Sequence, residues 1–162
     1  MALRIDRLGK SIPARFAHRY WNSWSFGFSM RGMSTFNKLR EAGLPVGSAC
    51  AFDTGAIIAP QWVEIGDESL DDMSFQISNG NEELATWNYS SLLLKTDELI
   101  EVLSRYMTFK TGDILYLGFP EEGISLSADM KIIVNRSFKK GSDTIFHPFS
   151  GFNIRTYPQK GH

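Results

Sequence analysis

The segment that most constrains the fold of this 162-residue chain is MSFQISNGNEELATWN, residues 73–88. Apolar and polar residues alternate on either side of Asn79-Gly80, and an Asn-Gly pair in this setting favours a tight turn between antiparallel strands. The sequence therefore predicts a β-hairpin whose strands cover residues 73–78 and 83–88.

Other parts of the chain have the composition of strands, because they are rich in β-branched and aromatic residues. The predicted strands cover residues 2–6, 23–29, 113–118 and 130–135. A short helical turn is expected in ARFAHRY, residues 14–20.

Helical periodicity is confined to two longer segments. The first covers residues 34–43, with Ser34 as N-cap and Gly43 as its stop, and the second begins at Thr96 and ends near Met107. Because strands outweigh helices, the expected fold class is α+β and predominantly β, with two or three short helices.

The chain has enough apolar material for one compact domain, since 43% of its residues are hydrophobic and 22% are charged. We assign this domain to residues 1–162 and leave the Gly-, Lys-, Ser-, Phe- and Pro-rich tail at 137–162 without assigned structure. The single cysteine, Cys50, excludes an internal disulfide and a cysteine-built zinc site within this sequence.

Charge and hydropathy exclude two classes of partner. The net charge of -1 gives no general attraction to nucleic acid or to an anionic membrane surface. The apolar runs are far shorter than the roughly 20 residues of a membrane helix, and MALRIDRLGK has no apolar signal segment. We therefore expect a soluble cytoplasmic protein without nucleic-acid or membrane partners.

Six ordered segments together span about residues 2–135: LRIDRLGKSIPARFAHRYW, LREAGLP, AFDTGAIIAP, ISNGNEELATWNYSSLLL, ELIEVLSRYMT and FKTGDILYLGFPEEGI. In this order and spacing they resemble the fumarylacetoacetate hydrolase family. The resemblance implies a mixed β-roll that is usually dimeric. It also implies magnesium- or manganese-dependent hydrolysis, isomerisation or decarboxylation of 2-oxo acids and acylpyruvates, with the metal acting as a Lewis acid.

The resemblance also implies where the metal ligands belong. The family's Glu-X-Glu pair stands before the segment similar to LRIDRLGKSI, and this sequence starts after that place, at Met1. The third ligand is the Asp of Gly-hydrophobic-Asp-hydrophobic-Thr-Ala-Arg-Asp, which resembles GFSMRGMS and places Ser29 at the Asp. A neutral hydroxyl does not replace a carboxylate for Mg²⁺. The same register places Arg31 at the Thr, Gly32 at the Ala, Met33 at the Arg and Ser34 at the second Asp.

Two further family positions differ in the same way. The lysine of the family's Lys-Gly-Phe-Asp corresponds to Cys50 in CAFD, and the second Thr of Thr-Gly-Thr-Pro corresponds to Phe119 in LGFP. The Gly118-Phe119-Pro120 corner thus keeps its architecture, whereas Phe119 fills the space of a ligand-binding hydroxyl. The candidate ligand-pocket residues are Ser29, Cys50, Asp53, Asn88 and Phe119, and no metal ligand is assigned.

The remaining chemistry-bearing residues favour structural roles. We expect VEIGDESLDD, residues 63–72, to be a solvated connector, because it lacks the ligand spacing of a calcium loop. His18 is expected to be partly buried and hydrogen-bonded, and Cys50 to be a small buried hydrophobe rather than a nucleophile. The aromatic cluster at residues 19–28 is expected to be core or subunit interface.

These observations predict a catalytically degenerate member that acts as a binding or assembly protein, without a metal cofactor, and that forms a homodimer covering exposed sheet edges. The alternative is an active Mg²⁺ or Mn²⁺ enzyme that acts on a small 2-oxo acid. Its ligands would come from a displaced site, for example Asp53 with Glu64 or Glu83, or from a partner subunit. A longer natural product that includes the Glu-X-Glu pair also remains open.

Overall fold

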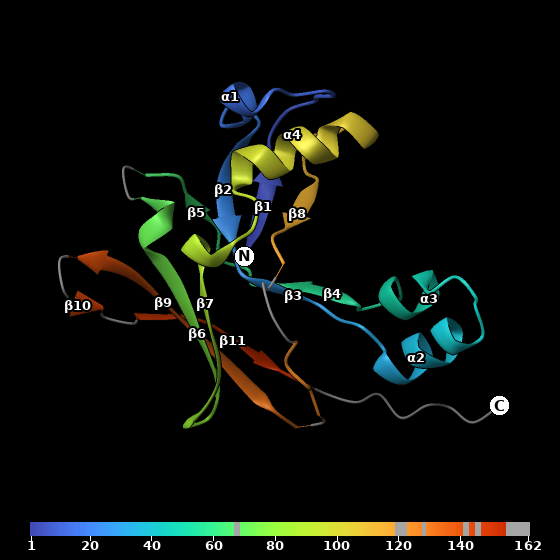
Figure 1. Cartoon of the computed structure of the whole chain (residues 1–162). Coiled ribbons are helices and arrows are strands. Elements are labelled where there is room, and N and C mark those ends of the chain that lie inside the picture. Colours follow the sequence, from blue (N-terminus) through green and yellow to red (C-terminus); the bar gives the residue numbers. More distant parts are fainter. Residues whose placement is uncertain (67–68, 119–122, 128, 141–142, 145–146, 155–162) are drawn as a thin grey trace.

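The structure is a computed structural model that describes residues 1–66, 69–118, 123–127, 129–140, 143–144 and 147–154. The Phe119-Pro120 corner therefore lies outside the described residues. Figure 1 shows two sheets that meet at the middle of the molecule, with α4 across one end and α2 and α3 to one side. The α+β, predominantly β class is confirmed.

The first sheet has the strand order β5-β2-β1-β8. Its strands are β1 (Ala2–Ile5), β2 (Trp21–Ser25), β5 (Val63–Glu64) and β8 (Ile114–Tyr116), and each neighbouring pair is antiparallel. The central strands β1 and β2 are mostly buried, and in β2 the buried residues include the small polar Ser23 and Ser25 beside Trp21 and Trp24.

The second sheet contains the predicted hairpin. Strands β6 (Met73–Asn79) and β7 (Glu82–Asn88) pair antiparallel, which confirms the prediction. The turn lies one residue later than expected, over Gly80 and Asn81, and Gly80 adopts a left-handed φ of 59° that suits glycine.

Strand β9 (Lys131–Lys140) pairs with the other edge of β6. Strands β10 (Asp143–Thr144) and β11 (His147–Asn153) pair in turn with β9, so the tail that had no predicted structure completes this sheet. Every pairing in both sheets is antiparallel within the part of the chain that the structure describes.

The predicted strand at 23–29 is two strands. Strand β2 ends at Ser25, and β3 (Gly27–Ser29) leaves the sheet to pair with β4 (Ala56–Ile58). Gly27 permits this close approach, because a Cβ atom there would lie 2.4 Å from the Ile57 carbonyl oxygen.

Aromatic rings form the core between the sheets. The Trp24 ring of β2 stacks on Phe149 at a centroid distance of 5.5 Å and meets Phe75 edge-on at 5.6 Å. Phe26 lies 4.9 Å from Phe75 between ring centroids. The prediction that the aromatic cluster packs in the core is therefore confirmed for Trp21, Trp24, Phe26 and Phe28, which are all buried.

The helices are α1 (Ala14–Ala17), α2 (Met33–Glu41), α3 (Gly47–Cys50) and α4 (Thr96–Tyr106), together with 3₁₀ turns η1 (Leu70–Asp72) and η2 (Tyr89–Ser91). The predicted N-caps were wrong by one or two residues. Gly32 rather than Ser34 precedes α2, and Lys95 rather than Thr96 precedes α4, because Thr96 already bonds Tyr89. Helix α3 was not predicted. None of these helices is long and apolar enough to cross a membrane.

Helix α4 is held against the segment that follows β1 by Ser104, which is fully buried. The Ile12 backbone N–H donates to Ser104 Oγ at 2.8 Å, and the Ser11 N–H donates to the Ser104 carbonyl oxygen at 2.8 Å. The Ala14 N–H donates to Glu101 Oε2 at 3.0 Å. One turn of α4 therefore satisfies three backbone donors of a distant loop.

We expect Ser104→Ala to lower the free energy of unfolding by about 1–3 kcal/mol, because the buried Ile12 N–H loses its acceptor. Urea unfolding followed by circular dichroism measures the change. Ser34→Ala, at an exposed position of α2, is the matched control and should change stability little. Equal stability of the two variants would contradict the role given to Ser104.

Candidate functional site

The residues singled out by the family resemblance gather where β3 runs into α2. Ser29 is the exposed last residue of β3 and pairs with Ala56 of β4. The Gly32 N–H donates to the Ala49 carbonyl oxygen at 2.9 Å, which brings α3 and its last residue, Cys50, beside this segment.

The side chains in this region carry little acid or base chemistry. The Arg31 guanidinium lies 4.6 Å from the centroid of the Phe36 ring, and the Met33 side chain is exposed. Cys50 is half-buried rather than buried, so the expectation of a small buried hydrophobe was wrong; α3 packs through Ala49 instead. Asp53 is exposed in the turn that follows.

Asn88 belongs to a different part of the molecule. It is the last residue of β7, and its Oδ1 atom accepts a hydrogen bond from Ser74 Oγ at 2.7 Å. The structure therefore brings Ser29, Cys50 and the α2 start together, engages Asn88 in the hairpin, and leaves Phe119 outside the described residues.

The donor set at the β3 end does not fit a hard divalent cation. A hydroxyl, a guanidinium, a thioether and a thiol stand at Ser29, Arg31, Met33 and Cys50, whereas Mg²⁺ and Mn²⁺ prefer carboxylate oxygens. Among the residues with described positions, no three His, Cys, Asp or Glu side chains are grouped closely enough to hold a metal ion. Glu83, suggested for a displaced site, instead accepts hydrogen bonds from Gln76 and Thr86.

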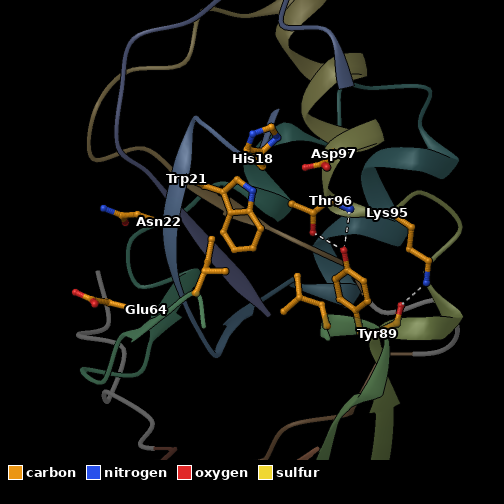
Figure 2. Close-up of a pocket in the computed structure, with 10 residues that line it drawn as sticks. His18, Trp21, Asn22, Glu64, Tyr89, Lys95, Thr96 and Asp97 are labelled. Carbon is orange, nitrogen blue, oxygen red and sulfur yellow. Dashed lines mark hydrogen bonds between the residues drawn. The ribbon is translucent and has the colours of Figure 1, made fainter. Parts of the chain in front are cut away.

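A pocket of about 700 Å³ lies elsewhere, between β2, β5 and the start of α4 (Figure 2). Strand β2 contributes Trp21 and Asn22, and β5 ends beside it with Glu64. The remaining lining residues come from the C-terminal ends of α1 and β5, the two 3₁₀ turns and the start of α4: His18, Ile65, Leu70, Tyr89, Lys95, Thr96 and Asp97.

One wall of the pocket is fixed by Tyr89. Its Oη atom accepts a hydrogen bond from the Thr96 N–H at 3.1 Å and bonds Thr96 Oγ1 at 2.8 Å. The Lys95 ammonium forms an ion pair with Asp71 at 2.9 Å and donates to the Tyr89 carbonyl oxygen at 3.2 Å. Tyr89, Thr96 and Lys95 are thus committed to holding η2 against the start of α4.

Three other side chains that line the pocket, those of Trp21, Asp97 and His18, do not link these elements. Trp21 is 6% exposed, and its buried Nε1 has no hydrogen-bond partner in the described part of the chain. Burial raises the pKa of the half-buried Asp97 above its ordinary value of 3.8, and the nearby His18 acts in the opposite direction. In Figure 2 the Trp21 nitrogen faces the side of the pocket where His18 and Asp97 lie.

For two of these residues, His18 and Glu64, the sequence analysis predicted an environment but no role in a pocket. His18 is exposed, so the expectation of a partly buried side chain was wrong; it caps the short helix α1 and lines the pocket. Glu64 is exposed, but the expectation that residues 63–72 form only a connector was wrong: Val63–Glu64 form β5, which pairs with β2, and Leu70–Asp72 form η1. Trp21, Tyr89 and Asp97 were not candidate site residues, because their neighbourhood depends on contacts between distant segments.

The chain is similar to known proteins over most of its length. The family described as "Fumarylacetoacetate (FAA) hydrolase C-terminal" matches residues 30–147. An uncharacterised protein of Pyrococcus abyssi is 27% identical over 120 residues, which cover 74% of this chain and 53% of that protein. The chain therefore spans about half the length of the curated relatives it matches.

Two solved structures show the similarity of fold. A protein of Yersinia pestis CO92, assigned to the fumarylacetoacetate hydrolase family, has a TM-score of 0.77 and 17% identity, covering 94% of this chain and 66% of that one. The fumarylpyruvate hydrolase of Pseudomonas aeruginosa, in complex with Mn²⁺ and pyruvate, has a TM-score of 0.71 and 20% identity, covering 83% and 58%.

The raised pKa of Asp97 has a consequence for stability. The folded protein binds a proton at Asp97 more tightly than the unfolded chain does, so this residue's contribution to the free energy of unfolding falls as pH rises above 3.8. We expect Asp97→Asn to remove that fall, so the free energy of unfolding of the variant, relative to wild type, should increase as pH rises above 3.8. Urea unfolding at each pH measures it. Glu41→Gln, an exposed carboxylate of α2, is the control; parallel wild-type and Asp97→Asn curves would contradict the assignment.

Proposed function

The chain belongs to the fumarylacetoacetate hydrolase family, and we propose that within it the protein is a catalytically degenerate member that works as a binding or assembly protein. The family membership carries with it a hydrolase/isomerase fold. The degeneracy is a separate proposal, which depends on the chemistry of particular side chains.

The observation that supports the proposal is the donor set around the end of β3. The family resemblance requires an Asp ligand at Ser29 and a lysine at Cys50, and the neighbouring Arg31 and Met33 supply no replacement oxygen. The Gly32–Ala49 hydrogen bond keeps these positions together in this chain. This argument is independent of any residue that precedes Met1.

The alternative is a metal-dependent enzyme of the family's reaction type. The fumarylpyruvate hydrolase of Pseudomonas aeruginosa binds Mn²⁺ and pyruvate in its structure, and at 20% identity the likeness to it concerns the fold. An active site in the present chain would need carboxylates from another part of the protein or from a partner subunit.

Metal binding separates the two functions. We expect calorimetric titration with Mn²⁺, alone and with oxalate as a mimic of a 2-oxo acid enolate, to show no saturable binding below millimolar concentration, because a hydroxyl and a thiol are poor ligands for this ion. The Pseudomonas fumarylpyruvate hydrolase serves as the positive control.

A second titration makes the test specific to the β3 end. Ser29→Asp, which restores a carboxylate at the family position, is compared with Asn37→Asp, which adds the same charge at an exposed position of α2. Saturable Mn²⁺ binding by the unmodified chain, strengthened by oxalate, would contradict the proposal that the protein is catalytically degenerate and would favour the metal-dependent enzyme.

We further propose that the assembly is a homodimer formed through the α2–α3 end. Helix α2 has no buried residue, and the nearby side chains of Met33 and Leu44 are each 54% exposed. An amphipathic helix without a buried face is stabilised when another surface covers it.

Sedimentation equilibrium tests the dimer. We expect a dimer at micromolar concentration and a shift towards monomer in Leu44→Glu, because a charge would be desolvated at the interface. Leu93→Glu, which alters the 93% exposed side chain before α4, is the matched control and should leave the dimer unchanged. A monomeric wild-type chain would contradict this arrangement.

A further inference from the structure

The pocket between β2, β5 and the start of α4 contains polar groups that the fold itself leaves unused. We propose that it binds a small organic amine that carries a hydrogen-bond-accepting oxygen close to its ammonium group. This site is separate from the question of metal chemistry, because Ser29, Arg31, Met33 and Cys50 do not line it.

The charges in the pocket favour a cation. Lys95 is paired with Asp71 and donates to the carbonyl oxygens of Tyr89 and Ser90, so its charge is neutralised within the protein. The side-chain carboxylates of Glu64 and Asp97 form no ion pair or hydrogen bond with any other described residue. His18, beside Asp97, is the remaining ionisable group with a positive form. An anionic ligand would meet two carboxylates, whereas an ammonium group would pair with one of them.

The indole N–H of Trp21 is the reason why the ligand needs an oxygen that accepts a hydrogen bond. A buried indole N–H without an acceptor is destabilising, and neither Asp97 nor His18 bonds it in this structure. The nitrogen faces their side of the pocket in Figure 2, so an oxygen bound to it would lie on the same side as an ammonium group at Asp97. We therefore take the two ligand groups to be close to each other, as in a 2-amino alcohol or an α-amino amide.

Apolar side chains provide the rest of the site. Trp21, Leu70 and Tyr89 are at least half-buried and line the pocket together with Ile65. A volume of about 700 Å³ is within the range of roughly 300–1,000 Å³ that is usual for small-molecule sites. An aromatic or branched aliphatic substituent on the amine would fill this space.

Four probes that share one phenyl ring separate the required groups. Phenylalaninamide has the ammonium and the oxygen, phenethylamine lacks the oxygen, N-acetylphenylalaninamide lacks the cation, and phenylalanine adds a carboxylate. We expect calorimetry with the full chain to show saturable binding of phenylalaninamide. Each of the other probes should bind at least about tenfold more weakly, because phenethylamine loses the acceptor for Trp21, N-acetylphenylalaninamide loses the cation, and phenylalanine adds a negative charge beside two carboxylates.

Variants assign the two contacts. Asp97→Asn should weaken phenylalaninamide binding about tenfold, and Glu41→Gln, an exposed carboxylate on α2, should leave it unchanged. Trp21→Phe should weaken phenylalaninamide but not phenethylamine, because only the first probe uses the indole N–H. A thermal melt of each variant establishes that it is folded.

A spectroscopic measurement keeps the proposal testable if Trp21→Phe does not fold. In the ¹H–¹⁵N spectrum of the wild-type chain, one of the four indole N–H signals should shift with phenylalaninamide and not with phenethylamine. Equal binding of phenylalaninamide and its N-acetyl form, no saturable binding of any probe, or equal affinity of Asp97→Asn and Glu41→Gln would each overturn the proposal.

Discussion

The contact on which the structure most depends is the packing of Trp24 between the two sheets. This ring comes from β2 and meets Phe75 of β6, Phe138 of β9 and Phe149 of β11, so one side chain joins the first sheet to three strands of the second. Aromatic rings bury large areas and prefer edge-on or offset stacked geometry, which fixes the distance and direction of their neighbours. The course of β2, and with it the position of both regions discussed above, follows from this packing.

Strand β2 has different surroundings at its two ends. Its first residue, Trp21, turns towards the start of α4, where Tyr89 links the end of β7 to the helix through Thr96. Beyond its last residue, Ser25, the chain leaves the sheet and forms β3, which leads to α2 and α3. The pocket and the family-related positions are therefore at opposite ends of the same rigid strand, and chemistry at one does not require chemistry at the other.

Local patterns predicted much of the fold. The hairpin of β6 and β7 follows from the alternation around Asn79-Gly80, and the length of α4 follows from its apolar spacing. The tail was not predicted, because β11 pairs with β9 through an irregular register near Pro148 that leaves no clear period in the sequence. The pocket was missed for a related reason: its side chains come from segments between His18 and Asp97, and only tertiary packing brings them together.

The lack of a buried face on α2 also bears on how this chain could have diverged from its relatives. Replacement of a core residue such as Trp24 leaves a cavity that the fold tolerates poorly, whereas replacement of an exposed residue usually changes stability by less than about 0.5 kcal/mol. Ser29, Arg31 and Met33 are all exposed. Selection for folding alone would therefore leave these positions free to drift, and a lineage could lose its ligands one substitution at a time while every intermediate still folded.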